Sequence, residues 1–130
     1  MYGSSIDQVA SAFFAAVETG DLKTVHEIYA PSVGVWHNVT GKTQTRDENL
    51  RLLEFLTGQV TDLKYEILAR EFFPGGFLQR HIVHGVVASG ERIEASVCVV
   101  VYVSDGKIVK LFEYLDAKAV DPVFNQAPAR

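Results

Sequence analysis

The sequence changes its pattern near residue 60, and this change constrains the fold more than any other feature. Before that point, apolar residues recur at the i, i+3, i+4 spacing of helices. After it come four segments rich in Val, Ile, Phe and Tyr, which is typical of strands: 60–73, 77–88, 92–103 and 107–116. A glycine-containing turn separates each segment from the next. Helices followed by hairpin-linked strands predict an α+β fold with an antiparallel sheet.

Two consecutive helices are predicted at the start of the chain. Ser5 and Gln8 have the spacing of a capping box, which marks the beginning of a helix. Gly20 is a typical helix end, and Asp21 can cap a second helix over 22–29. The two helices therefore form a hairpin with almost no linker.

A short strand and a third helix follow. Residues 33–38 have the composition of a strand. Thr45 and Glu48 form a second capping box, opening a helix that ends near Gly58. Strands as long as those after residue 60 must curve in so small a domain. We therefore expect a cone-shaped α+β barrel, with the curved antiparallel sheet wrapped around three helices and an internal pocket.

Length and composition set the broad class of the protein. The 130 residues suffice for one domain, whose core we expect over 5–120, with 121–130 as a loose tail. The net charge of −4 argues against a nucleic-acid partner, since such partners need a basic face. A single cysteine excludes an internal disulfide, and no apolar run is long enough for a membrane span. No leader pattern stands at the start, so we expect a cytoplasmic protein.

Several polar side chains share strand faces with apolar residues. Glu113 alternates with aliphatic residues, Arg80 shares a face with His84, and Trp36 shares one with Asn38. The alternation does not say which faces point inward. The hypothesis is that these five side chains converge on one cavity. Desolvation there would raise the pKa of a carboxyl group and suit it to acid–base chemistry, whereas a nearby arginine would keep it ionised.

The strand over 92–103 is apolar on both faces through most of its length. One face of such a strand packs on the core, and the other needs a separate cover. We therefore expect a homodimer that forms through the outer face of the sheet.

The order helix, helix, strand, helix and then a meander resembles the nuclear transport factor two-like superfamily. Within it, the chain resembles the SnoaL-like polyketide cyclases, the ketosteroid isomerases and the limonene-epoxide hydrolases. The resemblance covers about residues 5–120. Its motifs are Gly20-Asp21, Tyr29-Ala30-Pro31, the strand ending at Asn38, and the last strand, from Gly106-Lys107-Ile108 to Tyr114 and Asp116. These motifs specify the fold more closely than the reaction, because this fold hosts many chemistries.

The resemblance to the epoxide hydrolases implies matches for part of their catalytic set. An ungapped count back from Gly106-Lys107-Ile108 places their arginine on Arg80 and their last-strand acid on Glu113. Their asparagine corresponds to Asn38. Trp36 stands in place of their tyrosine, and Ile82 in place of the aspartate that activates water. Their hydrolysis is therefore not carried over intact.

The ketosteroid isomerases match less well. The positions of their tyrosine, aspartate base and second aspartate correspond to Phe13, His37 and Cys98, and none keeps the required group. The resemblance therefore favours the SnoaL-like cyclases by elimination.

We expect a cofactor-independent acid–base enzyme, with no metal, that acts as an isomerase, cyclase or hydrolase on a small apolar, polyketide-like or steroid-like molecule. Glu113 would be the acid or base, Arg80 would orient it, Asn38 would hold a water or substrate oxygen, and His84 would be a second base. The expected substrate-binding residues are Phe13, Trp36, Ile82, Cys98 and Leu111. The alternative role for Glu113, a purely structural ion pair with Arg80, stays open. The alternative function is a non-catalytic small-molecule-binding or dimeric interaction domain.

Overall fold

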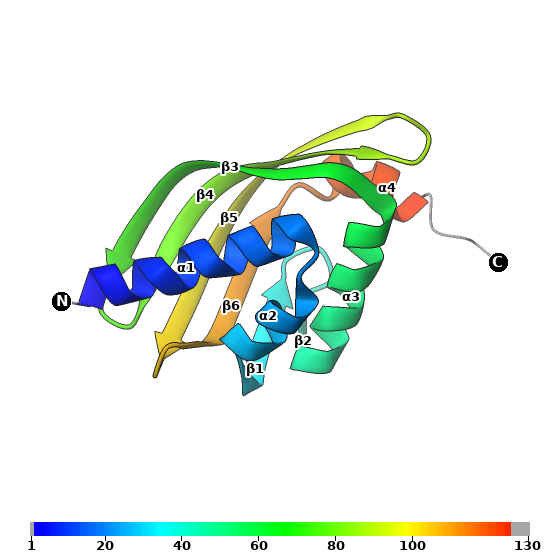
Figure 1. Ribbon diagram of the computed structural model, residues 1–130. Helices are drawn as coiled ribbons and strands as arrows, with labels where there is room; N and C mark the ends of the chain where they lie inside the picture. Colours follow the sequence, from blue (N-terminus) through cyan, green and yellow to red (C-terminus); the bar gives the residue numbers. More distant parts are fainter. Residues whose placement is uncertain (1, 126–130) are drawn as a thin grey trace.

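One curved sheet of six strands, in the order β2-β1-β6-β5-β4-β3, organises the molecule. In the computed structural model, which describes residues 2–125, the helices lie against the concave side of this sheet (Figure 1). The elements in chain order are α1 (Tyr2–Thr19), α2 (Leu22–Ile28), β1 (Tyr29–His37), β2 (Lys42–Gln44), α3 (Arg46–Gln59), β3 (Val60–Phe73), β4 (Gly76–Val87), β5 (Arg92–Ser104), β6 (Lys107–Leu115), η1 (Ala117–Val120) and α4 (Asp121–Asn125). The predicted cone-shaped α+β fold is confirmed, with a sheet that does not close into a barrel.

The meander from β3 to β6 matches the sequence pattern to within one residue at each strand end. The expectation of a wholly antiparallel sheet is wrong, because β1 pairs with β6 in parallel and the sheet is mixed. Hairpin turns fix the direction of β3 to β6, but no hairpin joins β1 to β6. No local turn therefore fixes the direction of β1 relative to β6, and strand composition carries no information on it.

Local capping signals explain two of the helix starts. Thr45 accepts a hydrogen bond from the backbone N–H of Glu48, and the Glu48 carboxylate accepts one from the N–H of Thr45, so the predicted capping box forms. Asp21 caps α2 through the N–H of Thr24. The capping box predicted at Ser5 does not mark a helix start, because α1 already begins at Tyr2. Within residues 2–125, no helix is both long and apolar enough to cross a membrane.

The main core lies between α1 and the inner face of the sheet. It contains buried side chains of α1, α2 and all the long strands except β3. A second cluster joins Val60, Val87 and Ile93 to Val123 of α4, which is fully buried. Of the expected loose tail, residues 121–125 form α4, which is anchored by Val123, and residues 126–130 lie outside the described part of the chain.

Candidate active site

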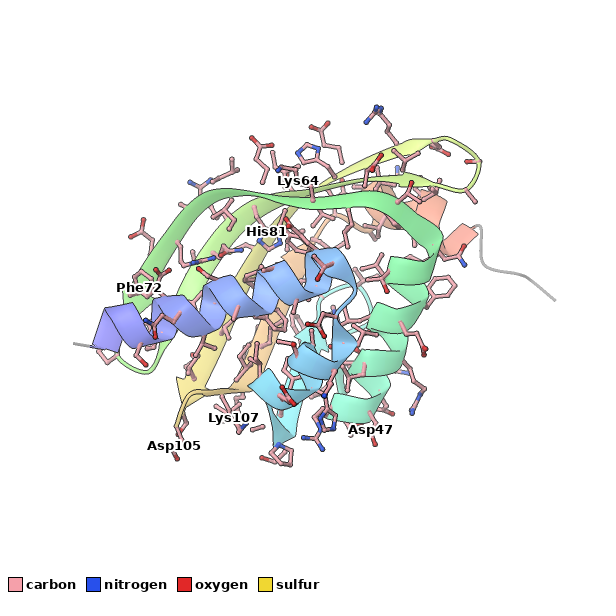
Figure 2. The ribbon with its side chains drawn as sticks, viewed as in Figure 1. Asp47, Lys64, Phe72, His81, Asp105 and Lys107 are labelled. Atoms are coloured by element: carbon pink, nitrogen blue, oxygen red, sulfur yellow. The ribbon has the colours of Figure 1, made fainter. Side chains whose placement is uncertain are left out.

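The inner face of β4 is the one that the hypothesis placed outside. Its buried side chains are Phe77, Gln79, His81 and Val83, and Figure 2 shows His81 between β4 and α1. Arg80 is exposed on the outer face, where Ile82 and His84 also lie. The expected arrangement is wrong by one residue because β4 carries apolar side chains on both faces. Its alternation therefore does not distinguish inside from outside.

The same reversal holds for β1. Trp36 packs on the outer face against Phe112 and Tyr114, with ring centroids 6.1 and 5.2 Å apart. His37, expected on the opposite side from the cavity, is the residue that faces inward with Val35. Two β-branched residues, Val33 and Val35, share the face of His37, and this pattern was the available signal for its orientation.

A small inner cavity lies between α1, α3 and the sheet. It has a volume of about 40 Å³, which is room for one or a few water molecules. Its lining is mostly aromatic and aliphatic, with a few polar groups: Phe13, Phe14, Val17, Tyr29, Val35, His37, Asn49, Leu53, Tyr65, Val99, Leu111 and Glu113. Of the predicted site residues, Phe13, Leu111 and Glu113 lie here.

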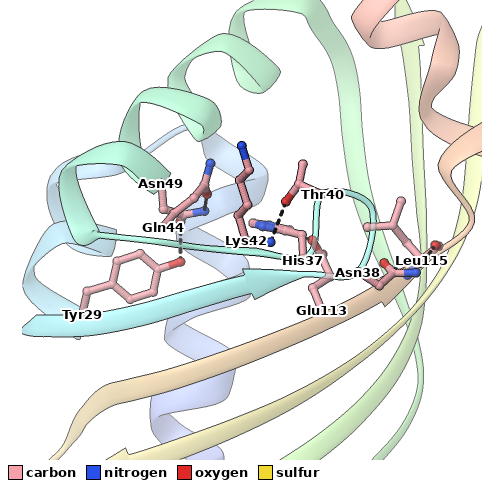
Figure 3. Close-up of polar contacts among 9 residues, drawn as sticks. All are labelled: Tyr29, His37, Asn38, Thr40, Lys42, Gln44, Asn49, Glu113 and Leu115. Atoms are coloured by element: carbon pink, nitrogen blue, oxygen red, sulfur yellow. Dashed lines mark hydrogen bonds and ion pairs between the residues drawn. The ribbon is translucent and has the colours of Figure 1, made fainter.

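A carboxylate–imidazole pair forms one wall of this cavity. The Nε2 atom of His37 is 3.1 Å from Oε1 of Glu113, and the two side chains are 14% and 23% exposed (Figure 3). The parallel pairing of β1 with β6 sets His37 opposite Glu113. The partner of Glu113 is therefore His37 and not Arg80, as the sequence hypothesis had it.

A buried hydrogen-bond chain forms a second polar part of the cavity wall. The hydroxyl of Tyr29 donates to Oδ1 of Asn49 at 2.7 Å, and Nδ2 of Asn49 donates to Oε1 of Gln44 at 2.9 Å (Figure 3). Burial, reinforced by the charge of Glu113, raises the pKa of Tyr29 above its usual range. Tyr29 therefore stays a hydroxyl donor at physiological pH.

Tyr65 stands beside this group on β3. Burial raises its pKa, and the charges of Glu113 and Glu18 act in the same direction. Glu18 of α1 also accepts a hydrogen bond from the backbone N–H of Tyr65 at 2.7 Å, which ties α1 to the edge strand. The ring of Tyr65 contacts His81. Tyr65 and His81 were not predicted as site residues, since β3 and β4 both mix apolar and polar side chains on each face.

The remaining predicted site residues lie on the outside of the sheet. Asn38, Arg80 and Cys98 line an open outer groove of about 440 Å³, together with Ser96, Tyr114 and Asp116. Both ends of the Asn38 amide bind the backbone of Leu115: Nδ2 donates a hydrogen bond to the carbonyl oxygen, and Oδ1 accepts one from the N–H (Figure 3). His84 pairs with Glu66 at 2.8 Å, away from the cavity.

The inner cavity is the better candidate site although the outer groove is larger. The inner cavity places a carboxylate, an imidazole and two tyrosines among apolar walls, where electrostatic interactions are strong. The outer groove is open to solvent, and its Arg80 is exposed.

Within residues 2–125, no three His, Cys, Asp or Glu side chains are grouped as a metal site requires.

Comparison with known proteins agrees with this architecture. The family model described as "SnoaL-like domain" matches residues 10–111. Among solved structures, IdmH, a candidate polyketide cyclase from Streptomyces antibioticus, is 18% identical with a TM-score of 0.80, over 92% of this chain and 97% of its own. An M. tuberculosis LEH-like epoxide hydrolase is 18% identical, with a TM-score of 0.78 over 95% and 91%. PrhC from Penicillium brasilianum is 14% identical, with a TM-score of 0.84 over 94% and 87%.

These structural likenesses, at such low identities, show the fold and not the reaction. A search of curated proteins finds no match by sequence. The family match covers most of the chain, from within α1 to Leu111 in β6, and ends before Glu113. The chain therefore belongs to the SnoaL-like domain family.

Proposed function

We propose that this chain is a cofactor-independent acid–base enzyme that acts on a small apolar molecule in the inner cavity. The observation that carries the proposal is the contact between His37 and Glu113 in the cavity wall. A carboxylate within hydrogen-bond distance of an imidazole, beside a mostly apolar cavity, is a common arrangement for proton transfer.

Glu113 is the proposed proton acceptor and donor. His37 orients its carboxylate through the contact of 3.1 Å between Nε2 and Oε1. Tyr29 and Tyr65 keep their hydroxyl protons and make the cavity wall polar at two points. Arg80 and His84 have no part in this scheme, because both lie on the outer face of the sheet.

The volume of the cavity bears on the substrate. About 40 Å³ admits water and little more, so a ring-containing substrate must displace side chains of α1 and α3, such as Phe13 and Leu53. A small enone, epoxide or short polyketide-like molecule requires less displacement than a steroid. The proposal therefore favours the smaller substrates among those that the sequence suggested.

The test is turnover of a panel of apolar epoxides, enones, steroids and aromatic polyketide mimics by matched variants. Glu113→Gln removes the proposed acid–base group and should lower kcat by about 10²- to 10⁴-fold for any substrate found. Glu66→Gln is the control, because Glu66 makes the same kind of contact with His84 on the outer face. Equal turnover by wild type and Glu113→Gln would refute the proposal.

A second candidate function is a non-catalytic dimeric interaction domain. It is favoured by contacting aromatic side chains on the outer face of the sheet: Trp36, Phe73, Tyr102, Phe112 and Tyr114. Tyr102 and Tyr114 are 40% and 46% exposed, although large aromatic side chains are usually covered. Sedimentation of wild type and of a Tyr114→Lys variant tests this surface. A dimer that the charge weakens would support it, and a wild-type monomer would contradict it.

A further inference from the structure

His81 is a buried titratable residue that the proposed function does not use. It is 1% exposed on the inner face of β4. Its ring centroid lies 5.3 Å from that of Phe14 and 4.9 Å from that of Tyr65. Both of these residues line the inner cavity. His81 therefore stands directly behind the cavity wall, between β4 and α1 (Figure 2).

A chain of hydrogen bonds determines which nitrogen of His81 carries the proton. Arg70 has only donors, and its Nε donates to Oε1 of Gln79 at 2.8 Å. The amide nitrogen of Gln79 therefore faces Nδ1 of His81, 2.9 Å away. An amide nitrogen only donates, so Nδ1 must accept. In the neutral ring, the proton then lies on Nε2.

This chain is anchored on α1. Nη1 of Arg70 donates to the carboxylate of Asp7 at 2.6 Å and to the hydroxyl of Ser11 at 2.9 Å. Gln79, in the middle of the chain, is fully buried. The orientation of its amide is therefore fixed from one side by Arg70 and cannot be reset by solvent.

The His81 ring is neutral at physiological pH. Burial lowers its pKa to about 4, and the charge of Arg70 adds to this effect, while Glu113 acts in the opposite direction. A neutral ring whose Nδ1 is already an acceptor has a single N–H left to offer. That N–H is at Nε2, which is buried and has no hydrogen-bond partner among the residues that the structure describes. A buried donor left without an acceptor is unfavourable and uncommon in native proteins.

We infer that the Nε2–H of His81 is a hydrogen-bond donor held for a carbonyl-type oxygen of the ligand in the inner cavity. Asp7, Arg70 and Gln79 are positioning residues that fix the tautomer. The inference rests on the proposed function, because it deepens the same site by assigning its ligand an oxygen acceptor. A neutral imidazole is suited to this role, since it donates a hydrogen bond without introducing a buried charge.

The sheet register agrees with a ligand held between His81 and Glu113. Glu113 pairs with Val99, and Val99 pairs with Gln79, so Glu113 and Gln79 are two strands apart. Two strand spacings are about 10 Å, and His81 is the next inward-facing residue on β4. His81 is not itself among the residues that line the cavity, so a small molecule that contacts the carboxylate of Glu113 reaches the imidazole once the ring of Phe14 or Tyr65 moves aside.

The first test needs no ligand. Two-dimensional ¹⁵N NMR of the imidazole groups should show the His81 proton on Nε2 in the wild type. In Gln79→Glu, the new carboxylate only accepts, so the proton should move to Nδ1. Circular dichroism checks that the variant is folded. A wild-type ring protonated on Nδ1 would overturn the inference, whatever the variant does.

The second test uses 2-cyclohexenone and cyclohexene, which have similar shapes and differ in the carbonyl oxygen. Both should shift the ring signals of His37, and only the enone should shift Nε2–H of His81. If the enone shifts His37 and leaves His81 unchanged, the inference fails and the proposed function stands. If neither compound shifts His37, the inference and the proposed binding cavity both fail.

Discussion

His37 and Glu113 face each other across the parallel pair of β1 and β6, with Nε2 and Oε1 3.1 Å apart. The two residues belong to distant parts of the sequence, one in the helical half and one in the last strand. Their contact therefore depends on how β1 aligns with β6. The same alignment places Trp36 next to Phe112 on the opposite face. One register thus determines both the cavity wall and the aromatic outer face.

The hydrogen bond between Tyr29 and Asn49 should contribute to stability. Both residues are 2% exposed, so Tyr29→Phe leaves the Asn49 oxygen buried without its donor. We expect the free energy of unfolding to fall by about 1–3 kcal/mol, measured by urea denaturation. Tyr114→Phe, at an exposed tyrosine, is the control and should change it by less than about 0.5 kcal/mol. Similar effects of the two substitutions would contradict this account of the buried pair.

The same substitution at two glycines should act in opposite directions. A Cβ on Gly85 would overlap Cγ1 of Val60, a stiff side chain in the second core cluster, so Gly85→Ala should destabilise by about 1–3 kcal/mol. Gly58 lies in α3 with open space around it, and Gly58→Ala should stabilise by up to about 1 kcal/mol. Thermal unfolding of both variants is the measurement.

A double variant identifies the cause of the Gly85 effect. Adding Val60→Ala to Gly85→Ala removes the overlapping methyl group. The double variant should therefore lose less unfolding free energy than the sum of the losses in the two single variants. Full additivity would mean that overlap with Val60 is not the reason for the loss.

The capping box of α3 makes a similar local prediction. Thr45→Ala removes the acceptor for the N–H of Glu48 and should cost about 1 kcal/mol of unfolding free energy. Thr45→Ser keeps the hydroxyl and should restore most of it. Equal unfolding free energies of the Ala and Ser variants in urea would show that the hydroxyl of residue 45 does not stabilise the protein.

Acidification should destabilise the fold through His81. The pKa of His81 in the folded protein is about 4, below the ordinary value of 6.5. Between these two pH values, the imidazole is protonated in the unfolded chain and neutral in the folded one. Stability should fall as the pH drops from about 6.5 to about 4, by on the order of 3 kcal/mol, and this contribution should then level off. In His81→Asn, which does not titrate, that fall should be absent from urea denaturation at each pH. An unchanged pH dependence in the variant would contradict the assignment.

The sequence predicts the architecture better than it predicts the site, for a physical reason. Strand ends after residue 60 follow from turn chemistry, which is local, and Thr45 caps α3 through contacts within one turn. The side of the sheet on which a residue lies depends on packing against distant elements. Where β4 is apolar on both faces, as at Ile82 and Val83, its alternation is uninformative, and the placement of Arg80 in the cavity was wrong by one position. For β1, Val33 and Val35 share the face of His37, whereas the family match to Asn38 favoured the other face.

The most direct test of the account is to locate the ligand. Each compound of the epoxide, enone, steroid and polyketide-mimic panel is titrated into the protein while the imidazole signals of His37 and the fluorescence of Trp36 are recorded. These two residues are neighbours in sequence on opposite faces of β1, so they separate the inner cavity from the outer face of the sheet. The account predicts a saturable shift of His37 with at least one chemical class and no matching change of Trp36. A saturable change of Trp36 with His37 unmoved would place binding on the outer face and contradict the assignment of the inner cavity.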